Sequence, residues 1–183
     1  MQHSTTQEDA SCLLVGPFTQ LLTMEGLPDK GPLRDSQMPV IQDAGILFKN
    51  GQIEKVAAYT RLREEARKAR AAIHEIQGPA IGIPGLIDSH THSCFAGSRA
   101  RDYALRNSGS TYLEIARAGG GIWDTVWHTR NATPEFLEAL LMERIEKFLH
   151  AGITTLEVKS GYGLTLESEL KMLRVIRQLK EQA

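Results

Sequence analysis

The order of the apolar segments in the second half of the chain is the feature that most constrains its fold. Leu86–His90 and Ile153–Val158 are short apolar or β-branched runs typical of strands. A segment with helical spacing of apolar residues follows each of them, the first opening at Thr133-Pro134 and the second at Thr165. Strands that alternate with helices favour a parallel sheet, either open or closed into a barrel. We therefore expect an α/β fold.

The apolar spacing also predicts which side of each helix is buried. In the final helix we expect the core side to be formed by Leu166, Leu170, Leu173 and Ile176. Gly152 suits the left-handed stop of the helix that opens at Thr133. The stretch from Ser93 to Asn131, which is rich in glycine, gives no clear element of its own.

The first part of the chain has a different pattern, rich in β structure. Residues 12 to about 58 are predicted to form strands, with Asn50-Gly51 at a hairpin turn because this dipeptide tolerates the positive φ that the turn demands. Gly26–Pro39 is predicted to be a loop, and Arg61–Ala72 a charged, solvated helix. The pattern changes after Gly78-Pro79, which divides the chain into segments 1–78 and 79–183.

The charge balance excludes several classes of partner. The net charge of −1 gives no sign of binding to nucleic acid or an anionic membrane. No apolar run approaches the roughly 20 residues that a membrane helix needs, and Met1–Ser11 lack the apolar core of a secretory signal. The two cysteines, Cys12 and Cys94, form no disulfide framework. We expect a reduced, cytoplasmic protein.

The sharpest chemical signal is the His-x-His motif formed by His90 and His92 at the end of a predicted strand. Side chains two apart on a strand share a face, so both imidazoles can reach one ion, which suits zinc or iron. The carboxyl end of a strand is where barrel enzymes place their chemistry. A catalytic zinc normally has three protein ligands and an open position for water. The pair therefore predicts part of a metal site.

The segment Pro84–His92 resembles the first-strand signature of the amidohydrolase superfamily, and further segments resemble its imidazolonepropionase family: Phe95–Ala100, Tyr112–Ile122 and Glu157–Leu164. This resemblance implies a composite β-sandwich over residues 1–78. It also implies that residues 79–183 are the first two βα units of a metal-dependent (β/α)₈ barrel, which takes about 250 residues when complete. The family opens the ring of 4-imidazolone-5-propanoate, a small-molecule substrate, to give N-formimidoyl-L-glutamate in histidine degradation.

The same resemblance implies roles for individual residues. His90 and His92 match ligands of one Zn²⁺ or Fe²⁺/Fe³⁺ ion, and Arg99, Tyr162 and Tyr112 match substrate-binding residues. The planar guanidinium of Arg99 suits a carboxylate, although a surface salt bridge is the alternative. Arg101 and Arg106 are nearby cations that could take its place. The resemblance also implies a homodimer.

The remaining ligands and the catalytic residues of the family are expected beyond Ala183, so we expect the 183-residue chain to be inactive by itself. Two alternatives stay open, a related cyclic amidase or deaminase of the superfamily and a non-catalytic remnant that binds metal. Lys159 is expected to pair or hydrogen-bond instead of bridging two metals, and Cys94 to be a buried thiol. His128 and His150 have helical contexts and no mark of a ligand.

Overall fold

The computed structural model describes residues 12–182, so Met1–Ser11 lie outside the described residues. The chain divides between Pro84 and Gly85 into two compact units. Each unit has its own cluster of buried apolar side chains. Within the described range, no helix has both the length and the apolar character needed to cross a membrane.

The first unit is built on a five-stranded sheet in the order β3-β2-β1-β4, with a short fifth strand also paired to β1. The strands are β1 (Cys12–Leu22), β2 (Val40–Lys49), β3 (Gln52–Ala58), β4 (Ala72–Glu75) and β5 (Ile81–Gly82). The β2–β3 hairpin turns at Asn50 and Gly51, whose φ angles of 52° and 75° confirm the predicted turn. The β4 and β5 strands were not predicted, and both run parallel to β1.

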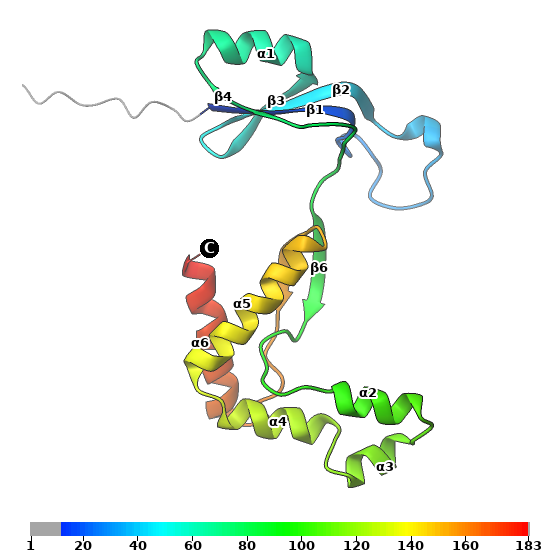
Figure 1. The fold of residues 1–183 in the computed structure, drawn as a ribbon, viewed down its shortest axis with the longest axis vertical. Helices are drawn as coiled ribbons and strands as arrows, with labels where there is room; N and C mark the ends of the chain where they lie inside the picture. Colours follow the sequence, from blue (N-terminus) through cyan, green and yellow to red (C-terminus); the bar gives the residue numbers. More distant parts are fainter. Residues whose placement is uncertain (1–11, 183) are drawn as a thin grey trace, which may run out of the picture. The chain divides into compact units, whose positions relative to one another are not determined.

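One helix, α1 (Tyr59–Lys68), covers this sheet (Figure 1). It begins two residues before the predicted helix and ends four residues earlier, because the chain turns back after Lys68 to form β4. Leu62 and Ala66 of α1 pack on Leu14 of β1, and Tyr59 completes the cluster. The described residues of this unit form a single sheet, so the β-sandwich stays a prediction.

The second unit contains two parallel strands, β6 (Leu86–Thr91) and β7 (Ile153–Val158). The connection between them ends in the helix α5 (Pro134–His150), and α6 (Leu166–Gln182) follows β7. The hydroxyl of Thr133 accepts a hydrogen bond from the Phe136 amide at the start of α5, as its capping role requires. Gly152, with a left-handed φ of 82°, stops α5 and leads into β7, as predicted. The strand–helix–strand–helix order and the α/β class are confirmed.

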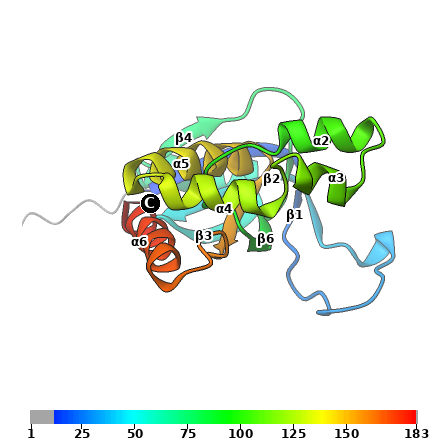
Figure 2. The same ribbon diagram turned by 90° about the horizontal axis from the view of Figure 1, so that it is seen from below.

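Three short helices fill the stretch for which the sequence gave no clear element. They are α2 (Ala100–Asn107), α3 (Tyr112–Arg117) and α4 (Ile122–Asn131). They lie beyond the carboxyl end of β6, with α2 and α3 side by side (Figures 1 and 2). Thr111 and Glu114 form a reciprocal capping box at the start of α3.

The core of the second unit lies between α5, α6 and the segment after β6. It consists of Cys94, Ala96, Leu137, Leu141, Met172, Val175 and Leu179. The predicted core side of α6 was wrong for its three leucines, because Leu166 is 78% exposed and Leu170 and Leu173 are also exposed. Its fourth residue, Ile176, is partly buried and packs against the core as predicted. Met172, Val175 and Leu179 instead face α5, since these positions point to the helix that α6 contacts.

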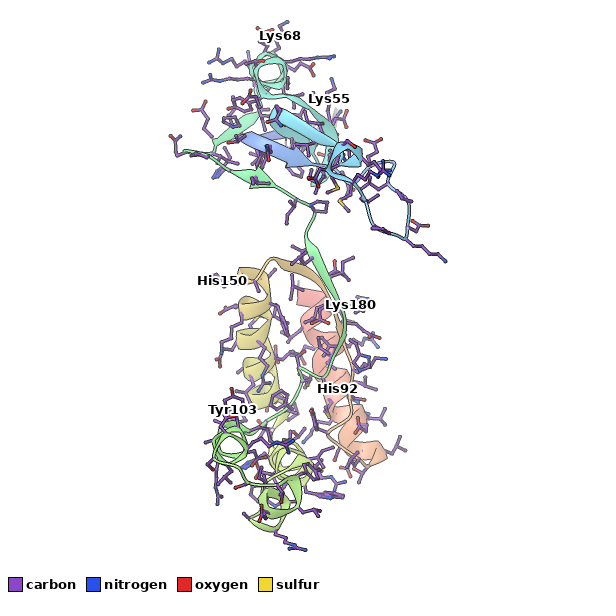
Figure 3. All side chains as sticks on the ribbon, turned by 90° about the vertical axis from the view of Figure 1, so that its right-hand side faces the viewer. Lys55, Lys68, His92, Tyr103, His150 and Lys180 are labelled. Carbon is purple, nitrogen blue, oxygen red and sulfur yellow. The ribbon has the colours of Figure 1, made fainter. Side chains whose placement is uncertain are left out.

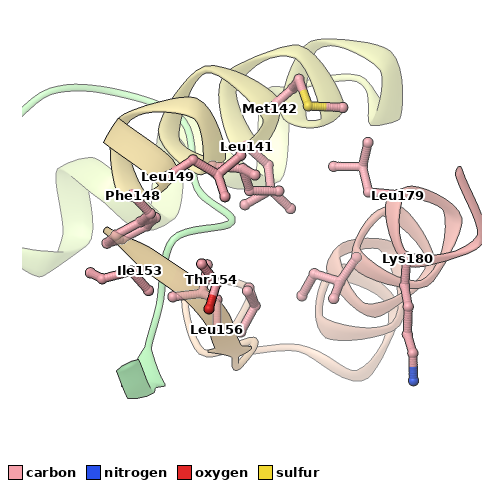
Figure 4. Close-up of a pocket in the computed structure, with 12 residues that line it drawn as sticks. Leu141, Met142, Phe148, Leu149, Ile153, Thr154, Leu156, Leu179 and Lys180 are labelled. Atoms are coloured by element: carbon pink, nitrogen blue, oxygen red, sulfur yellow. The ribbon is translucent and has the colours of Figure 1, made fainter. Parts of the chain in front are cut away.

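An apolar groove of about 250 Å³ runs between α5, β7 and α6 (Figure 4). Leu141, Phe148 and Ile153 line one part of it, and Leu156, Ile176 and Leu179 another. Large apolar side chains elsewhere in this unit are also exposed, including Leu86 and Ile87 on β6. The apolar surface of the second unit is therefore only partly covered by the described residues.

Candidate functional site

The parallel pairing of β6 and β7 fixes the strand end that carries the two histidines. The Lys159 amide donates to the Thr91 carbonyl at 2.8 Å, and the Thr91 hydroxyl donates to the Glu157 carbonyl at 2.7 Å. The His90 amide donates to Asp88 Oδ1 at 3.3 Å. Hydrogen bonds at the His90 amide and at Thr91 thus fix the backbone that carries the two histidines.

The structure brings His90 and His92 together, as their spacing predicts. Their ring centroids are 5.3 Å apart with the ring planes at 69°. Two imidazoles bound to one tetrahedral zinc, with Zn–N distances of about 2.0–2.1 Å, have centroids about 5 Å apart. The separation therefore fits two ligands of a single ion.

The loop after β7 packs directly on His92. Gly161 has a φ of 151°, and a Cβ placed on it would lie 2.9 Å from both Cε1 and Nδ1 of the His92 ring. The Tyr162 ring meets the His92 ring edge to face, with centroids 5.9 Å apart. The absence of a side chain at Gly161 lets the imidazole lie against the loop backbone.

His92 also has an unsatisfied polar atom. Its Nδ1 is buried and has no hydrogen-bond partner within the part of the chain that the structure describes, whereas His90 is exposed. A buried nitrogen without a partner costs about 1–3 kcal/mol, so a further group that satisfies this ring is expected. Among residues 12–182 no three His, Cys, Asp or Glu side chains gather as a metal site would require. The donor set fits two positions around a metal and leaves the others to groups outside it.

Two charged side chains fix the loop that carries Gly161 and Tyr162. Glu169 Oε1, from the first turn of α6, accepts hydrogen bonds from the amides of Gly163 at 2.8 Å and Leu164 at 2.7 Å. Arg130 Nε donates to the Gly163 carbonyl at 2.6 Å. Burial raises the pKa of Glu169, but hydrogen bonds from the Ser160 hydroxyl and the loop amides outweigh it, so the net pKa is lowered.

Arg99 and Tyr112 lie together in a separate hollow of about 310 Å³ on α2 and α3, which Tyr103 and Arg106 also line. Tyr103 is labelled on α2 in Figure 3, and His92 just beyond β6. The predicted residues therefore form two groups, His90, His92 and Tyr162 in one and Arg99 and Tyr112 in the other. Of the spare cations, Arg106 reaches this hollow and Arg101 does not line it.

Asp102 orients Arg99 within that hollow. The Arg99 Nε donates to Asp102 Oδ2, which also accepts from the Gly121 amide at 2.8 Å. The Gly121 hydrogen bond, followed by the Arg99 guanidinium, lowers the pKa of Asp102. The salt bridge that was the alternative for Arg99 is thus present, and it joins Asp102 to the Nε side of the Arg99 guanidinium.

The predictions for Lys159 and Cys94 are confirmed. Lys159 Nζ pairs with Glu157 Oε1 at 3.4 Å. Cys94 is fully buried, and burial raises its pKa to about 11. His128 pairs with Asp124 at 3.4 Å on α4, and His150 Nδ1 lies 2.7 Å from the Glu146 carbonyl oxygen.

Comparison with known proteins gives a specific relationship, although no family model matches the chain. An imidazolonepropionase from Myxococcus xanthus is 43% identical over 171 residues, which are 93% of this chain and 40% of that protein. The chain resembles imidazolonepropionase. The imidazolonepropionase from Symbiobacterium thermophilum is 42% identical over 168 residues, which are 91% of this chain and 39% of that protein.

Other imidazolonepropionases match more strongly over shorter segments. That of Aeromonas salmonicida is 58% identical over 101 residues, which are 55% of this chain and 25% of that protein. The chain spans about 40% of the length of the imidazolonepropionases that match most of it, which is consistent with an N-terminal portion. A solved structure of a triazine hydrolase from Arthobacter aurescens is similar in fold, with a TM-score of 0.54 at 19% identity, over 93% of this chain and 34% of that one.

Proposed function

We propose that this chain is part of a metal-dependent hydrolase of the imidazolonepropionase type. The reaction is the hydrolytic ring opening of 4-imidazolone-5-propanoate to N-formimidoyl-L-glutamate in histidine degradation. The observation that carries the proposal is the paired His90 and His92 at the carboxyl end of β6, in a chain that is 38–58% identical to imidazolonepropionases where it matches them.

In this proposal His90 and His92 hold one Zn²⁺ or Fe²⁺/Fe³⁺ ion. When bound, the ion supplies a polarised water for attack on the ring. Tyr162 lies against His92 and contacts the substrate, and the bonds from Glu169 and Arg130 to Gly163 keep its loop in place. Residues 12–182 supply two of the ligands, and the proposed enzyme takes the other ligands and its catalytic residues from outside them.

Arg99 and Tyr112 bind the propionate carboxylate in the proposed enzyme. The Asp102 carboxylate holds the Nε side of Arg99, which leaves the two terminal nitrogens of the guanidinium for a planar anion. Arg106 adds a second positive charge to the same hollow. These contacts orient the substrate by its charged end and require no proton transfer from this chain.

The proposed architecture follows from the same relationship. The first unit is one part of a composite β-sandwich, and β6 and β7 begin a (β/α)₈ barrel, a reading supported by the likeness to the triazine hydrolase. Further barrel elements cover the exposed apolar surface of the second unit, including the groove of Figure 4. A cytoplasmic location and a homodimer remain predictions.

A chimera tests the activity directly. The matching 171-residue segment of the Myxococcus xanthus imidazolonepropionase is replaced by this chain, and loss of the imidazolone absorbance is followed with added Zn²⁺ or Fe²⁺. The chimera is expected to turn over the substrate, and a His90→Ala, His92→Ala chimera to lose that turnover. His150→Ala is the control, because its ring is on the exposed end of α5. A folded but inactive chimera, beside an active parent, contradicts the proposal.

A further inference from the structure

Arg144 of α5 binds the backbone that directly follows His92. Its Nη1 donates to the carbonyl of Ser93 at 2.8 Å and to that of Phe95 at 2.7 Å. The guanidinium carbon also lies 3.7 Å from the centroid of the Phe95 ring. One partly buried cation therefore fixes both the backbone and a side chain of this turn.

The Phe95 ring continues this contact to the paired histidines. It meets the Tyr162 ring edge to face at 5.6 Å, and Tyr162 in turn meets His92 at 5.9 Å. Arg144 thus acts on His92 by two routes, through the backbone of Ser93 and through the rings of Phe95 and Tyr162. Both routes start on α5, outside the turn and the loop that they hold.

A salt bridge does not explain this placement. Arg144 donates its hydrogen bonds to main-chain carbonyls, and no ion pair of Arg144 is found among residues 12–182. Other cations of the same unit, such as Lys147 and Arg177, form exposed pairs one turn away on their own helix. The side chain of Arg144 is therefore used to hold a turn and not to stabilise its own helix.

We propose that Arg144 is a positioning residue for His92 and Tyr162, which sets the geometry of the metal ligand and of the neighbouring substrate contact from the outer helix. The part of this proposal that concerns metal affinity rests on the proposed function. The part that concerns the order of the turn and the loop does not.

The test compares Arg144→Met, which keeps an unbranched apolar stem but removes the guanidinium and all its donors, with two controls. Val175→Ala weakens the same core but leaves the hydrogen bonds of Arg144 in place, so it matches a general loss of stability. Lys147→Met removes an exposed cation from the same helix. Amide hydrogen exchange is followed by mass spectrometry in residues 92–98 and 159–165, where the amides of Ala96, Gly163 and Leu164 are hydrogen-bonded. Zn²⁺ affinity is measured by competition with a chromophoric chelator.

In Arg144→Met, exchange in both segments is expected to rise about tenfold over Val175→Ala, the change expected from the loss of a charge-assisted hydrogen bond. The Zn²⁺ dissociation constant of Arg144→Met is expected to rise about 10–100-fold. That of Lys147→Met is expected to stay at the wild-type value, and that of Arg144→Lys to lie between the values of the wild type and Arg144→Met. Exchange in both segments equal to that of Val175→Ala overturns the proposal. If the wild-type chain binds no more Zn²⁺ than the His90→Ala, His92→Ala variant, the metal site fails, and the exchange result alone decides the role of Arg144.

Discussion

Replacing Gly161 with alanine tests the contact between the β7 loop and His92. The added Cβ would lie 2.9 Å from Cε1 and Nδ1 of His92, about 0.5 Å short of the 3.4 Å at which ordinary contact begins. Metal sites keep their ligand distances within about 0.2 Å, so a ring displaced by this amount no longer presents its nitrogen correctly. Changes beside a ligand typically cost about 10–100-fold in metal affinity, and we expect Gly161→Ala to fall in that range.

The same substitution also strains the backbone, because φ at Gly161 is 151°, and a strained residue costs about 1–3 kcal/mol. Gly109→Ala separates the two effects. Gly109 has a φ of 97° and no heavy atom within 4 Å of its Cβ position, so it adds strain without contact. Zn²⁺ affinity by chelator competition and stability by urea unfolding are measured for both variants. Equal Zn²⁺ affinity in Gly161→Ala and Gly109→Ala would refute the argument.

Three further predictions concern stability and reactivity. Leu137→Ala removes a fully buried side chain and is expected to lower the free energy of unfolding by about 2–5 kcal/mol in urea titrations, whereas the exposed Leu166→Ala changes it little. Glu169 has a lowered pKa, so its contribution is present above the ordinary carboxyl pKa of about 4.3 and is lost as pH falls through the folded value. Glu169→Gln is therefore expected to cost about 1–2 kcal/mol at pH 7 and to lose less stability than the wild type below pH 5; an identical acid profile would contradict this. Cys94, with its pKa raised to about 11 by burial, is expected to resist iodoacetamide at pH 8 until urea unfolds the chain, while Cys12 reacts first; early labelling of Cys94 in peptide mass spectra would count against it.

Local chemistry explains which elements could be predicted from the sequence. Asn50-Gly51 and Thr133-Pro134 act within a few residues, so the hairpin and the start of α5 follow from them. The helices α2, α3 and α4 are short and separated by glycine, which hides their apolar periodicity. The capping box of Thr111 and Glu114 was the available signal for α3.

Packing partners explain what could not be predicted. The leucines at 166, 170 and 173 show that α6 has an apolar face, but periodicity does not say which neighbour covers it, and Met172 and Val175 face α5 instead. In the site, the spacing of His90 and His92 on a strand was sufficient to bring them together. The place of Tyr162 beside His92 depends on the pairing of β6 with β7, which no local pattern encodes.

The supporting side chains were missed for a related reason. Asp102 is three residues from Arg99 on a helix, so their pairing was within reach of a spacing argument. Glu169 binds the amides of Gly163 and Leu164, which lie close to it in the sequence, whereas Arg144 binds a turn that is distant in the sequence. The contacts of Arg144 depend on tertiary structure.

The most direct test of the account is X-ray absorption at the zinc edge of the chain loaded with one equivalent of Zn²⁺. The account predicts two imidazole nitrogens at about 2.0–2.1 Å, completed by oxygen ligands such as water, and the loss of the imidazole signature in the His90→Ala, His92→Ala variant. A spectrum without imidazole, or one that the double substitution leaves unchanged, would contradict the assignment of His90 and His92 as metal ligands.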